Sequence, residues 1–167
     1  METNLFYQGI RPAISVGLSV SRVGGNAQTK AVKSVAKSLR IDLAQFRELA
    51  SFSQFSTDLD AETKQRIERG QRLTELLKQP QYSPYAIWQM YSSLLAATEG
   101  VFDSVPVDKI LLAEENLYRE LKAKHPKMVE AINSGNEPPE ADRTTILKVA
   151  GAIADSYKDK VSSKEAN

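Results

Sequence analysis

Arg22 is the strongest candidate in this sequence for a functional side chain. It follows a short segment in which apolar and small polar residues alternate. Between Ile14 and Val20, aliphatic residues alternate with serine and glycine, and this period of two predicts a β-strand with one apolar face. Gly24 and Gly25 follow and permit a sharp turn. The carboxyl end of a strand is the edge at which open α/β sheets bind ligands. A guanidinium there could neutralise an anionic group, although a surface arginine fits the same pattern.

The usual arrangements of catalytic residues are absent from the rest of the sequence. It has no Gly-x-x-x-x-Gly-Lys-[Ser/Thr] loop, so we expect the chain alone not to hydrolyse ATP. The chain has one histidine, His125, and no cysteine, which predicts no metal site. Glu114 and Glu115 are neighbours on a predicted helix and point in different directions, so they are not expected to form an acid–base pair.

The composition excludes several other classes of protein. The 167 residues are 41% hydrophobic and 26% charged, close to the average of globular proteins. With 22 basic and 21 acidic residues the net charge is +1, so bulk electrostatics give no reason to expect nucleic acid as a partner. No apolar run approaches the roughly 20 residues that a bilayer span requires.

The hydrophobic period changes to about 3.6 near Ala27 and predicts a helix from there to about residue 50. Asp60 is the expected N-cap of a second helix, and Ser83 with Pro84 the expected start of a third. Later helices are predicted over residues 106–125 and 126–132 and, after a loop of residues 134–139, up to Val161, and residues 162–167 are expected to fray. Gly70, inside the second helix, predicts close packing or a bend.

Two rows of basic residues follow the predicted helices. One row consists of Lys30, Lys33, Lys37 and Arg40, and the other of Arg66, Arg69 and Arg72. Charge runs on amphipathic helices are usually solvated, so we expect both rows to face water; an acidic partner is the alternative for the first.

A single strand cannot form a sheet. Nothing else in the sequence alternates over a comparable length, so the partner strands must come from another chain or from residues upstream of this one. We therefore expect the sequence to be a fragment of a longer protein.

The segment from Gly9 to Gly25 resembles the α subunit of F-type ATP synthase, at the point where its nucleotide-binding domain passes into its C-terminal helical domain. Further sequence segments typical of the same family follow in the same order. They are Asp42-Leu-Ala-Gln-Phe-Arg-Glu-Leu-Ala, Gln54-Phe with Ser56-Thr-Asp-Leu-Asp, and Arg69-Gly-Gln-Arg-Leu-Thr-Glu-Leu-Leu-Lys-Gln-Pro-Gln-Tyr-Ser-Pro. The likeness covers the first half of the chain and thins after Pro84, where Trp88 stands in a segment that is usually acidic.

This resemblance implies a mainly α fold. Residues 1–25 would be the last strand and turn of an α/β nucleotide-binding domain, residues 26–161 the helical domain, and residues 162–167 a frayed tail. The helical domain would be an antiparallel bundle of about five or six helices.

The resemblance also assigns roles to individual residues. Arg22 corresponds to the family's arginine finger, which reaches across a subunit interface and neutralises charge on the transferring phosphoryl group. Arg11, Pro12, Gln79, Gln81 and Val20 would line the adenine pocket of the non-catalytic nucleotide.

At the level of the whole complex, the resemblance implies part of a proton-translocating ATP synthase. The chain would support a ring of alternating α and β subunits, contact the β and γ subunits and the rest of its own α chain, and have ATP or ADP with Mg²⁺ as cofactors of the full complex. It would be peripheral to the membrane, on the cytoplasmic face in bacteria or its organellar equivalent, and no enzyme in isolation. The alternatives are a free-standing helical interaction module without a nucleotide role, and a piece of a V-type or flagellar relative.

Overall fold

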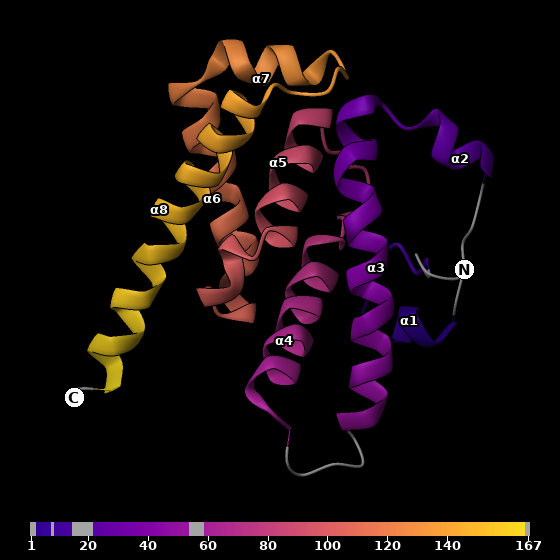
Figure 1. Ribbon diagram of the computed structural model, residues 1–167, viewed down its shortest axis with the longest axis vertical. Coiled ribbons are helices and arrows are strands. Elements are labelled where there is room, and N and C mark those ends of the chain that lie inside the picture. Colours follow the sequence, from indigo (N-terminus) through magenta and orange to yellow (C-terminus); the bar gives the residue numbers. More distant parts are fainter. Residues whose placement is uncertain (1–2, 8, 15–21, 54–58, 166–167) are drawn as a thin grey trace.

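The computed structural model describes residues 3–7, 9–14, 22–53 and 59–165, and these residues are mainly α-helical with no strand among them (Figure 1). The mainly α prediction is therefore confirmed, whereas the predicted strand lies, Ile14 apart, outside the described residues. The α-helices are α1 (Thr3–Tyr7), α2 (Arg22–Ala27), α3 (Lys30–Ser53), α4 (Ala61–Leu76), α5 (Ile87–Thr98), α6 (Ile110–Lys124), α7 (Pro126–Asn133) and α8 (Glu140–Glu165). Two 3₁₀ turns, η1 (Val101–Ser104) and η2 (Val107–Lys109), join α5 to α6.

Helix α5 is the centre of the core. It packs against α3 and α4 on one side and against α6, α7 and α8 on the other, as Figure 1 shows. Its sequence is apolar around most of its circumference, which is typical of a helix buried on all sides. Leu95 and Ala96 are fully buried, and Phe102 of η1 closes the same core.

Helices α3 and α4 approach each other closely at Gly70. A Cβ atom at this position would lie 2.2 Å from Cγ of Phe46 in α3, well inside van der Waals contact. The prediction of close packing at Gly70 is confirmed, because only a residue without a side chain leaves room for the phenylalanine.

Helix α3 begins later than predicted, at Lys30 rather than near Ala27. The glycines expected to form a sharp turn, Gly24 and Gly25, instead lie inside the short helix α2, and the chain bends at Gln28 and Thr29. The reason is the cap on the following helix, since the Thr29 hydroxyl accepts a hydrogen bond from the Val32 N–H at 3.4 Å.

The prediction that Asp60 caps α4 is confirmed. Its carboxylate accepts a hydrogen bond from the Thr63 N–H at 2.8 Å and another from the Thr63 hydroxyl at 2.8 Å. These bonds favour the ionised form, so they lower the pKa of Asp60 below its ordinary value.

The predicted start of α5 at Ser83 and Pro84 is wrong by three residues. The N-cap is Ala86, whose N–H donates at 2.9 Å to the side-chain oxygen of Gln89. Ser83 lies in the preceding loop, where its carbonyl accepts a hydrogen bond from Nε2 of Gln79 at 2.9 Å. A glutamine at the third helical position thus replaces the serine cap that the sequence favours.

The arginine row on α4 faces water only at Arg66, so the prediction for the other two members is wrong. Arg69 forms an ion pair with Asp103 of η1 and donates from Nε to its Oδ1 at 3.0 Å. Arg72 is 6% exposed and donates from Nε to the Val105 carbonyl at 2.7 Å. These two side chains fasten α4 to the segment that connects α5 and α6.

The last helix also differs from prediction. Helix α8 extends to Glu165, so residues 162–165 of the expected frayed tail continue the helix. Lysine and glutamate in this stretch have good helix propensity, and it contains neither glycine nor proline to end the helix. His125 joins α6 to α7, just before Pro126 opens the new helix.

Candidate functional site

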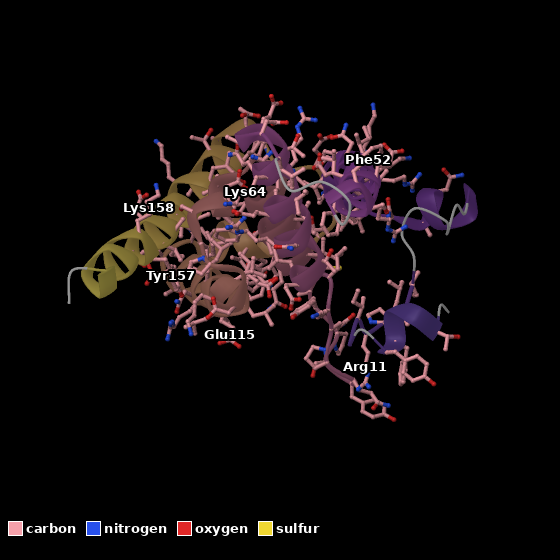
Figure 2. All side chains as sticks on the ribbon, turned by 90° about the horizontal axis from the view of Figure 1, so that it is seen from below. Arg11, Phe52, Lys64, Glu115, Tyr157 and Lys158 are labelled. Atoms are coloured by element: carbon pink, nitrogen blue, oxygen red, sulfur yellow. The ribbon has the colours of Figure 1, made fainter. Side chains whose placement is uncertain are left out.

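A pocket of about 500 Å³ lies between the segment around Arg11, the loop that follows α4, and helix α6. The first two segments are joined directly, because the Gln79 N–H donates to the Arg11 carbonyl at 2.8 Å. Figure 2 shows Arg11 beside α1 and Glu115 of α6 on the same lower side of the molecule. The pocket therefore unites residues about 100 positions apart in the sequence.

The loop that forms one wall is held by its own hydrogen bonds. Helix α4 ends at Leu76, and the N–H groups of Leu77 and Lys78 still donate to carbonyls of its last turn. Pro80 cannot continue a helix, and Tyr82 has a φ of 62°, in the left-handed region that reverses the chain. The Gln79 side chain spans this reversal through its bond to the Ser83 carbonyl.

The walls of the pocket differ in charge. Arg11 and Lys78 bring cations from the N-terminal segment and the loop, and Lys78 is paired with Glu75 at 2.6 Å. Helix α6 brings the carboxyl groups of Glu114 and Glu115. Such a pocket suits a flat polar group with hydrogen-bonding edges, since amides, carboxyl groups and aromatic rings all line it.

The structure brings together some of the predicted nucleotide-binding residues and not others. Arg11 and Gln79 share the pocket, and the Arg11 guanidinium also lies 4.6 Å from the centre of the Phe6 ring. Pro12 lines an adjoining apolar pocket with residues of α3 and α4 instead. Gln81 is exposed on the loop, and Val20 lies outside the described residues.

Sequence reasoning missed the α6 wall. Glu114 is 2% exposed, and the Tyr118 hydroxyl donates to its Oε1 at 2.6 Å. Burial raises the pKa of Glu114, while hydrogen bonds from Tyr118 and Ser93 oppose this shift. Burial, followed by the nearby Glu114 charge, also raises the pKa of Tyr118. The sequence offered one indication of this wall: Glu114 and Tyr118 are four residues apart, a spacing that places both on one face of a helix.

Two further aromatic rings pack against Tyr118 of that wall. The Trp88 ring packs edge-on against Tyr118, with ring centres 5.4 Å apart, and the Tyr85 ring lies tilted against Tyr118 with ring centres 6.2 Å apart. Trp88 is the single tryptophan of the sequence. Its contact with Tyr118 makes it a natural reporter of events in the pocket.

Arg22 is the first residue of α2, and its side chain lies outside the described part of the structure. Helix α2 lies beside the beginning of α3 at one edge of the molecule (Figure 1). Gly25 and Asn26 of α2 line a shallow pocket with Lys33, Lys37 and other residues of α3.

The described residues contain neither a metal-binding cluster nor a helix able to span a membrane. No three histidine, cysteine, aspartate or glutamate side chains gather there closely enough to hold a metal ion. No helix in that part of the chain combines the length and the apolar character needed to cross a bilayer.

The sequence matches the family described as ATP synthase alpha/beta chain, C terminal domain, over residues 28–153. Together with the helical fold, this match shows that the chain belongs to that family. ATP synthase subunit alpha from Ralstonia nicotianae is 50% identical over 146 residues, which are 87% of this chain and 28% of the relative. ATP synthase subunit alpha from Bordetella pertussis is 48% identical over 158 residues, 95% of this chain and 30% of the relative. The chain thus spans 28% to 30% of the length of these relatives.

Proposed function

We propose that this chain acts as part of the alpha subunit of a proton-translocating F-type ATP synthase. The observation that carries this proposal is the hydrogen bond between Arg11 and Gln79, which links the two segments that the family uses to hold adenine. It occurs in a chain half identical to alpha subunits over most of its length. The helical domain would support a ring of alternating alpha and beta subunits and contact the gamma subunit.

The non-catalytic nucleotide is the ligand that we propose for the pocket. ATP or ADP with Mg²⁺ would be bound in the full complex, and no tight binding is expected by this segment alone. The lining fits a nucleobase: Arg11 offers a flat cation, Gln79 an amide fixed by its bond to Ser83, and Tyr118 an aromatic edge. Pro12, Gln81 and Val20 would complete the site once the rest of the alpha chain is present.

Arg22 is proposed to act in a different site, at the interface with beta. Its guanidinium would reach the nucleotide of the beta subunit and neutralise charge that develops on the transferring phosphoryl group. The nucleotide and its metal ion supply the chemistry there, and Arg22 supplies positive charge in a planar, bidentate form. The chain is thus proposed to be catalytic only within the complex, peripheral to the membrane that the whole enzyme serves.

The pocket assignment is tested by nucleotide retention in a reconstituted ring. A full-length alpha chain that contains this segment is assembled with beta, and bound nucleotide is measured after gel filtration. Arg11→Ala is expected to release nucleotide from the non-catalytic sites while turnover persists, and Arg119→Ala, an exposed arginine of α6, serves as control. ADP should also change the Trp88 emission, measured as the difference from a Trp88→Phe ring. Equal retention by Arg11→Ala and the control would overturn the assignment.

A further inference from the structure

One face of α3 is strongly basic and has no counter-charge within the described part of the chain. This α3 basic face consists of Lys30, Lys33, Lys37 and Arg40, whose spacings of three and four residues place them on one side of the helix. All four are exposed, and none forms an ion pair with a described carboxylate. The opposite side of α3 carries the buried Ala31, Val35 and Leu39, so the basic face points away from the core.

The stability of α3 does not explain this arrangement. The first turn has two lysines and no acidic residue, although the positive end of a helix dipole favours acids there. Lys33 and Lys37 are four residues apart, a spacing at which like charges repel. Because the chain has a net charge of only +1, the positive charge is local and not a general property of the surface.

The surface beside the α3 basic face is concave. Gly25 and Asn26 of α2 form one side of a pocket of about 390 Å³, and Lys33, Lys37 and Arg40 form the other. Ile41 is 53% exposed at the same place and offers an apolar contact. Figure 1 shows α2 and the adjoining end of α3 at the outer edge of the molecule, with α4 and α5 on the far side of α3.

We propose that the α3 basic face binds an acidic segment of the beta subunit, the subunit that Arg22 is proposed to reach. This inference rests on the proposed role of Arg22 at the interface with beta. Arg22 begins α2, and Gly25 of the same helix shares a pocket with the α3 basic face. A helix of six residues is only about 9 Å long. A partner that receives Arg22 must therefore come close to the four cations.

The chemistry of the partner follows from the charges. Carboxylates set against Lys33, Lys37 and Arg40 would satisfy them, and an aliphatic side chain between these carboxylates would cover Ile41. Opposite charges at the rim of an interface mainly raise the association rate and fix the register of the two partners. Salt should screen this contribution strongly, because the four side chains are exposed.

The test is the double charge reversal Lys33→Glu with Lys37→Glu in the full-length alpha chain. Assembly with beta is measured by mass photometry at low and at high salt. We expect assembly at least 10-fold weaker at low salt, a smaller defect at high salt, and no loss of melting temperature in the alpha chain. The melting temperature should hold because both lysines are exposed and neither forms an ion pair with a described carboxylate. The matched control reverses Lys122 and Lys127, two exposed lysines of α6 and α7, and should assemble normally.

Several outcomes would overturn the proposal. Assembly equal to that of the control is one, and a defect that high salt does not reduce is another. Loss of binding to anionic vesicles or to RNA, with normal assembly, would assign the face to a different polyanion. The role of Arg22 is judged separately: Arg22→Ala should assemble normally at both salt concentrations and lose turnover. Full turnover with Arg22→Ala would refute the proposed arginine-finger role of Arg22. The docking proposal would survive that result if the double reversal still weakens assembly.

Discussion

The segment before α3 and the helical domain after it are built in opposite ways. The described residues from Lys30 onward bury a continuous core around α5, and the charged side chains Arg69 and Arg72 fasten α4 to the segment between α5 and α6. The described residues before α3 form helices of only five and six residues and bury little beyond Ala13. Arg11, Pro12 and Arg22, for which we propose direct functional roles, all lie in this weakly packed segment.

Helices as short as α1 and α2 do not form stably by themselves. The free energy lost in nucleating a helix exceeds the free energy gained from the hydrogen bonds of one or two turns. Their conformation must be supported by what they contact. Within the described chain this support is slight, and the bond from Gln79 to Arg11 is one of few links to the domain. The helical domain thus supplies most of the stability, and three residues with proposed functional roles lie in the weakly packed segment before it. Gln79 and the α3 basic face add proposed contacts from the helical domain itself.

The largest effect on stability should come from the centre of the helical domain. Leu95→Ala removes a fully buried side chain of α5 and should lower the free energy of unfolding by about 2 to 5 kcal/mol, as cavities in packed cores do. Leu112→Ala, at a position that is 49% exposed, is the control and should change it by less than about 0.5 kcal/mol. Urea denaturation with unchanged m values measures both. Equal effects would show that α5 is not the centre of stability.

A substitution at the contact of α3 with α4 should have a somewhat smaller effect. Gly70→Ala places a Cβ atom against Phe46, and relief of this clash requires the two helices to move apart. The expected cost is about 1 to 3 kcal/mol, which outweighs the gain in helix propensity from alanine. The double variant with Phe46→Ala should be more stable than the sum of the single changes predicts. Strict additivity in thermal unfolding would contradict the contact.

The buried carboxyl at the junction of the two regions should make stability depend on pH. Folding raises the pKa of Glu114, so the folded chain holds this proton more tightly than the unfolded chain does. The stability that depends on this group is fully present below the ordinary value of 4.5 and is lost as the pH rises toward the folded pKa.

Glu114→Gln resembles the protonated form and should remove this loss. Its melting temperature relative to that of the parent chain should therefore rise between pH 4 and pH 7. Parallel pH profiles for Glu114→Gln and the parent would contradict the burial argument.

The smallest effect on stability is expected in the N-terminal segment. Phe6→Ala removes the ring beside the Arg11 guanidinium, a contact of about 0.5 to 1 kcal/mol at an exposed site. Since Phe6 is 45% exposed, little core is lost with it. Differential scanning calorimetry should detect almost no shift in the unfolding of the helical domain. A cooperative loss comparable to that of Leu95→Ala would show that the two regions are one unit.

The sequence was informative where a local rule decides the structure. Asp60 caps α4 because an aspartate before a helical pattern can accept the free N–H groups of the first turn. Gly70 marked a close approach because glycine is unfavourable within a helix unless space requires it. The buried stripe of α3 followed from its period of 3.6 residues.

Interactions between distant residues could not be predicted in this way. Arg69 and Arg72 looked like a solvated row because their partners, Asp103 and Val105, are more than 30 positions away in the sequence. The α6 wall of the pocket was missed for the same reason, since only the fold brings Glu114 and Tyr118 to the loop of Gln79. The start of α5 depended on a side-chain acceptor, Gln89, which competed with the more usual serine.

Turnover of a reconstituted ring with Arg22 changed to alanine tests the central claim most directly. We expect assembly like that of the parent, nearly unchanged nucleotide affinity, and ATP hydrolysis lower by roughly 10³ to 10⁵-fold. Arg22→Lys should be similarly inactive, because an ammonium lacks the planar fork of the guanidinium. Parental turnover by Arg22→Ala in a fully assembled ring would contradict the account and leave this chain a scaffold alone.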